Sequence, residues 1–210
     1  MTDDLARFTA LTEAMGDSTA TDVLDRFSDL VRRSVTAHGG RIVKQIGDAF
    51  MIVFADAASA VVCALDVRDA AVAEPQFLGT RQGIHWGPTL YREGDYYGAT
   101  VNVAARIVAE AAADRVLVSH AVRTELGAVD DVELVAAGRR TLKHVADAVE
   151  VFEARRPGEE PTEQRVLDPV CGMAIDADVP AARLQLDGRD VMFCSQSCLQ
   201  RFVANPDGYR

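Results

Sequence analysis

The sequence lacks the features that would place it in a membrane, in an export pathway or on nucleic acid. None of its apolar runs approaches the roughly 18 residues that a membrane-spanning helix needs, and its start has no basic segment followed by an apolar core. Lysine and arginine number 22 against 32 acidic residues, and the resulting net charge of −10 argues against a general nucleic-acid binder. We therefore expect a cytoplasmic protein with neither a membrane span nor a signal peptide.

Cysteine is also scarce, and it is unevenly placed. Three of the four cysteines fall in the last 40 of the 210 residues. The polar, proline-containing segment 155–165 that precedes them has the composition of a linker. The length suffices for one domain of about 150 residues and one small module. We expect a first domain over 1–154, a linker over 155–165 and a module over 166–210.

A glycine and an aspartate stand between two strand-like segments of the first domain. Segments 41–46 and 49–54 are rich in β-branched and aromatic residues, as strands are. Gly47 and Asp48 between them predict a two-residue hairpin turn. Lys44 shares a face of the first strand with Ile46. A carboxylate on such a turn suits a divalent cation, which prefers oxygen ligands, although an ordinary surface hairpin has the same pattern.

A second group of polar residues lies about 50 residues further on. Asp95 falls in a loop bracketed by Gly94 and Gly98, and an alanine-rich segment follows. Asn102 and Arg106 are spaced i,i+4 in that segment, so on a helix they project side by side. Such an amide and guanidinium can hold an anionic oxygen, although a chance polar pair on a solvated helix face looks the same.

The rest of the first domain alternates between helical and strand patterns. Apolar residues recur with a helical period over 21–37, and 55–73 is a second helix rich in alanine and valine. Further strands are expected over 80–86, 115–119 and 149–153. We assign His85 and Trp86 to strand packing, and the sequence offers no credible nucleophile, base and acid triad.

The two polar groups together resemble the catalytic domain of the class III nucleotidyl cyclases, the adenylate and guanylate cyclases. The resemblance covers about residues 4–154, and segments 8–13, 38–41, 83–87 and 142–143 fall in the family's order and spacing. It implies an α/β (α+β) fold, in which helices pack on a ferredoxin-like cyclase sheet. It also implies homodimers in which each active site is shared between two chains.

The resemblance assigns roles to individual residues. The two aspartates that grip Mg²⁺ or Mn²⁺, two ions per active site, correspond to Asp4 and Asp48. Asn102 corresponds to the residue that orients the ribose, Arg106 to the one that stabilises charge at the α-phosphoryl group, and Lys143 to the triphosphate-binding lysine. The implied reaction is two-metal phosphoryl transfer, in which the ribose 3′ oxygen attacks the α-phosphorus of the nucleotide and pyrophosphate leaves.

Purine choice in the family rests on a lysine and an aspartate, which correspond here to Lys44 and Asp95. Lysine is a donor only and ionised aspartate an acceptor only, so the pair complements N1 and the exocyclic amine of adenine. Guanylate enzymes of the family generally carry glutamate and cysteine, or similar residues, instead. We therefore expect an adenylate cyclase that converts ATP to 3′,5′-cyclic AMP.

The chain departs from the family pattern at several positions. Only residues 1–3 precede Asp4, where the family has an apolar central strand, so we expect that strand to be largely missing: either the protein starts upstream or the domain lacks the element. Arg7 replaces a glycine beside the triphosphate site, where it either adds positive charge or blocks the turn. His144 and Ala148 replace a glycine and a proline near the triphosphate lysine.

The three C-terminal cysteines have the spacing of a metal site. Cys194 and Cys198 could share a face of a short helix beginning near Ser195, and Cys171 lies in a turn. Three converging thiolates suit Zn²⁺ or Cu⁺. A disulfide is disfavoured in a cytosolic chain and leaves one thiol unpaired, and three unrelated buried cysteines are a further alternative.

Segments 168–173, 193–198 and 202–206 resemble the YHS domain, a small treble-clef-like metal-binding module. The resemblance covers residues 166–210 and implies metal binding or metal sensing. Leu186 stands where related sequences often have histidine, so the sequence shows no fourth ligand. Two other functions stay open: a catalytically degenerate cyclase fold that acts as a regulatory protein, and a metal-handling protein whose first domain senses a nucleotide.

Overall fold

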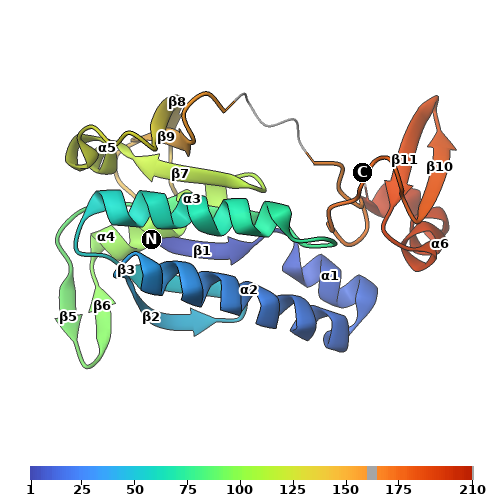
Figure 1. Ribbon diagram of the computed structural model, residues 1–210, viewed down its shortest axis with the longest axis horizontal. Helices are drawn as coiled ribbons and strands as arrows, with labels where there is room; N and C mark the ends of the chain where they lie inside the picture. The colour runs from blue at the N-terminus through green and yellow to red at the C-terminus, as the bar shows by residue number, and fades with distance from the viewer. Residues whose placement is uncertain (160–164, 210) are drawn as a thin grey trace.

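The computed structural model describes residues 1–159 and 165–209. Among these residues, seven strands form one mixed sheet in the order β2-β3-β1-β4-β7-β9-β8. Its strands are β1 (Thr2–Leu5), β2 (Arg41–Ile46), β3 (Ala49–Val53), β4 (Thr80–Ile84), β7 (Arg115–Ser119), β8 (Glu133–Arg140) and β9 (Val149–Arg155). The helices that pack on it are α1 (Phe8–Met15), α2 (Asp17–Ala37), α3 (Ala57–Ala73), α4 (Ala99–Glu110) and α5 (His120–Leu126). A small hairpin, β5 (Leu90–Arg92) with β6 (Asp95–Tyr97), projects beside the sheet (Figure 1).

The central strand of the sheet is present. β1 pairs antiparallel with β3 on one side and β4 on the other, with Asp4 opposite Arg81. The pairing extends to Met1, whose ammonium donates to the carbonyl of Ile52 at 3.0 Å. The expectation that this strand would be largely missing was therefore wrong, because its two neighbours supply the hydrogen-bonding partners and four residues suffice to span them.

Helices cover both faces of the sheet. Figure 1 shows α2 and α3 side by side over one face, and α4 lies behind the sheet. Under α2 and α3 the core includes Phe27 and Phe50, whose rings meet edge to face with centroids 5.6 Å apart. Under α4 the core is smaller and contains Ile107 and Leu117. The mixed α+β architecture expected from the sequence is thus confirmed.

Local sequence signals fix several element boundaries. Ile46 pairs with Ala49, and Gly47 has φ 62°, so the predicted two-residue turn over Gly47 and Asp48 is confirmed. α3 begins at Ala57, two residues later than predicted, because the Asp56 carboxylate caps it and accepts from the Ser59 amide at 2.7 Å. No helix among the described residues is long and apolar enough to cross a membrane.

The C-terminal residues form a small module beside α1 and α2. It consists of a loop over 168–173, the hairpin β10 (Ala182–Leu186) and β11 (Arg189–Phe193), helix α6 (Gln196–Ala204) and the 3₁₀ turn η1 (Pro206–Tyr209). Loop, hairpin and helix follow one another as in a treble clef. Met173 of the loop bridges to Leu78, and Phe193 and Phe202 of the module belong to the same buried cluster as Phe27. The module therefore shares a core with the cyclase-like sheet.

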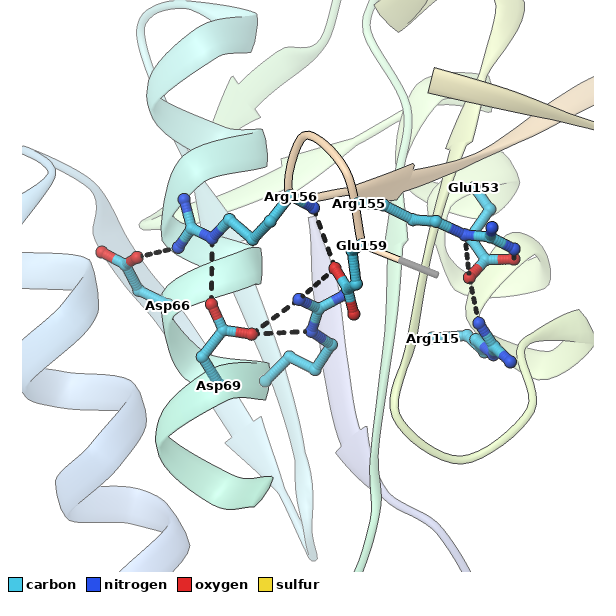
Figure 2. Close-up of polar contacts among 8 residues, drawn as sticks. Asp66, Asp69, Arg115, Glu153, Arg155, Arg156 and Glu159 are labelled. Atoms are coloured by element: carbon cyan, nitrogen blue, oxygen red, sulfur yellow. Dashed lines mark hydrogen bonds and ion pairs between the residues drawn. The ribbon is translucent and has the colours of Figure 1, made fainter. Parts of the chain in front are cut away.

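The segment that leads to the module is tied to helix α3 where the structure describes it. Figure 2 shows Arg156 between Asp66 and Asp69, and the backbone amide of Arg156 donates to Glu159 at 2.9 Å. Arg155, assigned to the linker from the sequence, is the last residue of β9. Residues 160–164, the middle of the predicted linker, lie outside the described residues, and the division into domains stays a prediction.

Candidate functional site

Two carboxylates from elements that are distant in sequence lie near the end of strand β1. Asp4 lies on β1, and Asp48 lies on the turn between β2 and β3. The Asp48 carboxylate accepts from the backbone amide of Leu5 at 3.2 Å, which ties the turn to β1. Burial raises the pKa of Asp4; the Arg81 guanidinium opposes this rise and the nearby charge of Asp48 adds to it. The structure thus brings the predicted metal ligands together.

Arg81 is a member of this site that was not found from the sequence. It stands opposite Asp4 in the pairing of β1 with β4, and its guanidinium donates to both Asp4 oxygens at 2.8 and 3.1 Å. One cation against two carboxylates leaves a negative site with oxygen donors, which suits Mg²⁺ or Mn²⁺. Only the strand register places Arg81 here, since nothing in the local sequence pairs it with Asp4.

The two residues predicted to read the purine form a direct ion pair. Nζ of Lys44 on β2 lies 2.5 Å from Oδ2 of Asp95 on β6, across 51 residues of sequence. The hydrogen bond from Lys44, together with the Tyr96 amide that donates to Oδ1 at 2.8 Å, lowers the pKa of Asp95. The pair therefore presents a fixed cation beside a fixed anion, both partly open to solvent.

Helix α4 presents the predicted amide and guanidinium to solvent. Asn102 and Arg106 lie one turn apart, and both side chains are exposed. The helix begins after Gly98, which has φ 128°. The two residues lie on one helix, as predicted, and no hydrogen bond or ion pair among the described residues joins them to Asp4 or Asp48.

The loop that carries the predicted triphosphate lysine lies between β8 and β9. Lys143 is exposed there, away from the contacts of the other candidate residues. The next residue, His144, has φ 63° and so occupies the left-handed region that favours glycine. Arg7, at the turn between β1 and α1, has the same φ of 63°. The family that the sequence resembles has glycine at both positions. The left-handed backbone explains this preference, because glycine adopts it without strain.

His85 packs at the end of strand β4 as expected. Its Nδ1 lies 2.7 Å from the hydroxyl oxygen of Ser119, and burial lowers the pKa of its imidazole. Trp86 packs against the apolar cluster under α3 and α5. Neither side chain has a contact with the carboxylates at β1.

The three C-terminal cysteines converge. Sγ of Cys171 lies 3.4 Å from Sγ of Cys194, which lies 3.8 Å from Sγ of Cys198, and all of these are free thiols. A carboxylate oxygen of Asp168 joins them, and the four potential ligand atoms all lie within 4.8 Å of one another. The hydrogen bond with Cys171, followed by burial, raises the pKa of Cys194, and burial raises the pKa of Cys198 to about 12.

Asp168 is the residue of this cluster that the sequence did not reveal as a potential ligand. It is fully buried, and its carboxylate accepts from the backbone amides of Val170 at 2.8 Å, Cys171 at 3.2 Å and Cys194 at 2.8 Å. The carboxylate thus fixes the backbone beside two of the thiols. Three thiols and a carboxylate that crowd together in a buried site suit a metal such as Zn²⁺.

The fold and these residues define the class of protein. The family described as the adenylate and guanylate cyclase catalytic domain matches residues 1–152. The chain therefore belongs to the adenylate and guanylate cyclase family, and its first domain is a cyclase catalytic domain. The matched residues end before the C-terminal module begins.

Individual relatives are bacterial. An uncharacterized protein of Mycobacterium tuberculosis strain H37Rv is 40% identical over 150 residues, which are 71% of this chain and 39% of that protein. A pH-sensitive adenylate cyclase of the same species, strain CDC 1551, is 33% identical over 156 residues, 73% of this chain and 39% of that protein. The chain thus spans about two fifths of the length of the curated relatives it matches.

Solved cyclase structures share the fold. A Trypanosoma brucei adenylate cyclase, studied in its monomeric state, superposes with a TM-score of 0.69 at 24% identity and covers 77% of this chain and 89% of that one. An adenylate/guanylate cyclase/hydrolase from Silicibacter pomeroyi gives a TM-score of 0.61 at 28% identity over 74% of this chain and 94% of that one. The first likeness is one of fold alone.

Proposed function

We propose that the chain is an adenylate cyclase that converts ATP to 3′,5′-cyclic AMP and pyrophosphate. The single observation that carries the choice of ATP is the ion pair of Lys44 and Asp95, 2.5 Å apart. A lysine donor suits N1 of adenine, and an aspartate acceptor suits its exocyclic amine. Guanine presents a carbonyl and a protonated N1 at the same places and is complemented less well.

The proposed chemistry places little covalent work on the protein, so positioning and charge dominate. Asp4 and Asp48 would hold Mg²⁺ or Mn²⁺, and the ions, when bound, lower the pKa of the ribose 3′-hydroxyl and neutralise the phosphates. Asn102 orients the ribose, Arg106 stabilises charge at the α-phosphoryl group, and Lys143 holds the terminal phosphates. Arg81 holds the Asp4 carboxylate in place.

Two copies of the chain are proposed to share each site. Asn102 and Arg106 face solvent on α4, whereas the carboxylates at β1 lie on another element of the same chain. Large apolar side chains are exposed on strand β2 and on the β5–β6 hairpin: Ile46 is 69%, Leu90 64% and Tyr91 53% exposed. Such exposed apolar groups support an interface between copies of the chain. A two-fold dimer then makes both sites equivalent.

Substitution of the purine pair tests the choice of nucleotide. Lys44→Glu together with Asp95→Cys removes the hydrogen-bond polarity that complements adenine, so kcat/KM for ATP relative to GTP should fall about 10-fold or more. Turnover of both nucleotides by the purified chain with Mn²⁺ measures this. Arg33→Glu on the outer face of α2 serves as the charge-reversal control. An unchanged ratio in the double variant contradicts the assignment of these residues.

Removal of a proposed metal ligand tests catalysis itself. Asp48→Ala should lower the rate of cyclic AMP formation at least about 100-fold, because a ligand of the ions is lost. Asp22→Ala, an exposed aspartate of α2, should leave the rate unchanged. Activity of Asp48→Ala equal to that of the parent chain would contradict the metal assignment. Absence of activity in the parent chain itself would favour the degenerate, regulatory reading.

We propose further that the C-terminal module is a YHS domain that binds one Zn²⁺ or Cu⁺. The convergence of Cys171, Cys194 and Cys198 with Asp168 supports this assignment. Thiolates release protons when they bind metal, so the affinity should fall steeply as the pH decreases. The cyclase domain stays folded in the proposal whether or not the metal is present.

Metal analysis of the full chain tests the module. We expect about one Zn²⁺ or Cu⁺ per chain, lost when any two of the three cysteines are replaced by serine. Asp168→Asn should lower the Zn²⁺ affinity about 10- to 100-fold, because an amide nitrogen then faces a backbone donor. Asp178→Asn, an exposed aspartate of the same module, should have no effect. A triple serine variant with unchanged metal content contradicts the site.

A further inference from the structure

Arg7 joins the cyclase site to the cysteine cluster. It lies on the turn between β1 and α1, three residues after Asp4, and its backbone has φ 63° and ψ 25°. Its guanidinium Nη2 donates to the carbonyl oxygen of Pro169 at 2.7 Å. Pro169 directly follows Asp168, so the acceptor belongs to the loop that carries the potential metal ligands. A single side chain thus links the turn after β1 to the ligand loop.

The metal-ligand loop approaches Arg7 at a second point, Gly172. Gly172 has φ 80°, and a Cβ at that position would lie 3.0 Å from Cβ and Cδ of Arg7. Only glycine therefore lets the loop sit against the arginine stem. At the far end of α1, Sγ of Cys198 lies 3.9 Å from Sδ of Met15. The cysteine cluster consequently touches the helix at its last turn and the residue that precedes it.

The geometry of the Pro169 carbonyl depends on the closure of the cysteine cluster. The Asp168 carboxylate holds the amides of Val170 and Cys171 on one side of the loop and the amide of Cys194 on the other. A metal bound by the thiols of Cys171 and Cys194 would fix the same two segments relative to each other. The Pro169 carbonyl, which accepts from Arg7, lies within the loop that these contacts fix.

The turn that Arg7 occupies sets the position of the catalytic carboxylates. Leu5, two residues before Arg7, donates its amide to Asp48, and Asp4 precedes Leu5. A left-handed backbone at Arg7 costs free energy that glycine would not incur, so contacts of its side chain must stabilise the turn. Those contacts come from the module.

We propose that Arg7 is a positioning residue that couples two binding sites. Through it, a metal ion bound at the cysteine cluster strengthens the binding of metal–nucleotide at Asp4 and Asp48, and the reverse also holds. This inference rests on the proposed function of both sites. A loaded cluster orders the loop that holds Arg7, and the held turn keeps Asp4 and Asp48 in place for the ions. Thermodynamic reciprocity requires that nucleotide binding then strengthen metal binding at the cluster.

The Zn²⁺ affinity of the full chain tests the coupling without any catalytic readout. Competition with a chromophoric chelator measures it with and without Mg²⁺ and 3′-deoxy-ATP, which lacks the attacking hydroxyl. Mg²⁺ is a hard cation and does not compete for thiolates. We expect the nucleotide to raise the Zn²⁺ affinity about 5-fold or more. Arg7→Gly suits the left-handed turn and cannot reach Pro169, so its affinity should not respond to the nucleotide.

Two further variants complete the test. Arg7→Lys keeps a donor for the Pro169 carbonyl, so its Zn²⁺ affinity should still increase in part when the nucleotide binds. If the side chain were merely structural, the retained donor would not preserve this increase. Arg183→Ala, at an exposed ion pair with Asp190 on the module, should leave the response intact. If the parent chain binds both Zn²⁺ and the nucleotide but its Zn²⁺ affinity does not change when the nucleotide is added, the coupling alone is overturned. A parent chain that binds no Zn²⁺, or no nucleotide, overturns the coupling together with the proposed function.

Discussion

At the residue scale, the most unusual side chain is a buried carboxylate at the centre of the sheet. Asp3 on β1 is fully buried, and neither of its oxygens has a hydrogen-bond partner among the described residues. Burial raises the pKa of Asp3 well above its ordinary value, and the charge of Asp4 adds to the rise, while the nearby Gln82 opposes it. Folding therefore favours the protonated form of Asp3 over the ionised form.

This protonation predicts how stability depends on pH. The unfolded chain ionises Asp3 above about pH 4, whereas the folded chain holds its proton to a higher pH. The contribution of Asp3 to stability is therefore full below about pH 4 and is lost as the pH rises through the raised pKa. Asp3→Asn cannot ionise, so its free energy of unfolding should decline less between pH 5 and pH 8. The free energy of unfolding of the variant, relative to that of the parent, should therefore increase by about 1 kcal/mol or more from pH 5 to pH 8.

Urea denaturation at several pH values measures the effect of Asp3→Asn. The Met1 ammonium, whose pKa burial lowers to about 6, titrates in both proteins and cancels in the comparison. Asp22→Asn on the exposed face of α2 controls for the loss of one negative charge. Parallel stability curves for the parent and Asp3→Asn would show that Asp3 is ionised in both states.

At the element scale, helix α3 anchors the segment that leads to the C-terminal module. Arg68 is buried and donates to Asp69 at 2.6 Å and to Glu159 at 2.9 Å. Arg156 spans Asp66 and Asp69 on the more exposed side of the same network (Figure 2). A shared network fixes the segment more firmly than isolated surface pairs would, because Asp69 serves both arginines.

The network predicts unequal costs for its two arginines. Arg156→Ala should lower the free energy of unfolding by about 1 kcal/mol or less, because exposed pairs contribute little and are screened by salt. Arg68→Ala should cost about 3 kcal/mol, since it removes a buried side chain together with its packing and its bonds to two carboxylates. Urea denaturation in about 0.1 M and about 1 M salt compares the free energies of unfolding of the two variants. Equal costs, or a larger cost for Arg156→Ala, would contradict this account.

At the scale of the whole molecule, the proposed dimer accounts for the separation of the candidate residues. Asp48 and Arg106 lie on different elements, and no described contact joins them within one chain. If two chains share each site, a mixed dimer of Asp48→Ala and Arg106→Ala contains one site with both defects and one with neither. Mixing the two inactive variants should restore about a quarter of the parent activity by random pairing.

Cyclic AMP formation by the mixture measures this complementation. Size-exclusion chromatography must show that each variant is folded and dimeric, and each variant alone provides the background. Activity of the mixture no greater than the sum of the two backgrounds would count against a shared site and for one assembled within a single chain.

The sequence alone determined the features that depend on near neighbours. Gly47 and Asp48 specified the hairpin turn because positive φ at a two-residue loop favours glycine. The i,i+4 spacing of Asn102 and Arg106 specified a shared helix face because the helical period is fixed. The cysteine spacing placed two thiols close together, because Cys194 stands just before helix α6 and Cys198 lies in its first turn.

Tertiary structure alone decided what depends on strand register and on the docking of the module. Arg81 meets Asp4 only because β4 pairs with β1 in one register, and Asp168 reaches the thiols only because the loop over 168–173 folds against the start of α6. The contact of Arg7 with Pro169 spans 162 residues and depends on a core shared by the two parts of the chain. Local propensity carries no information on such distances, because the contacts form only when separate hydrophobic faces are buried together.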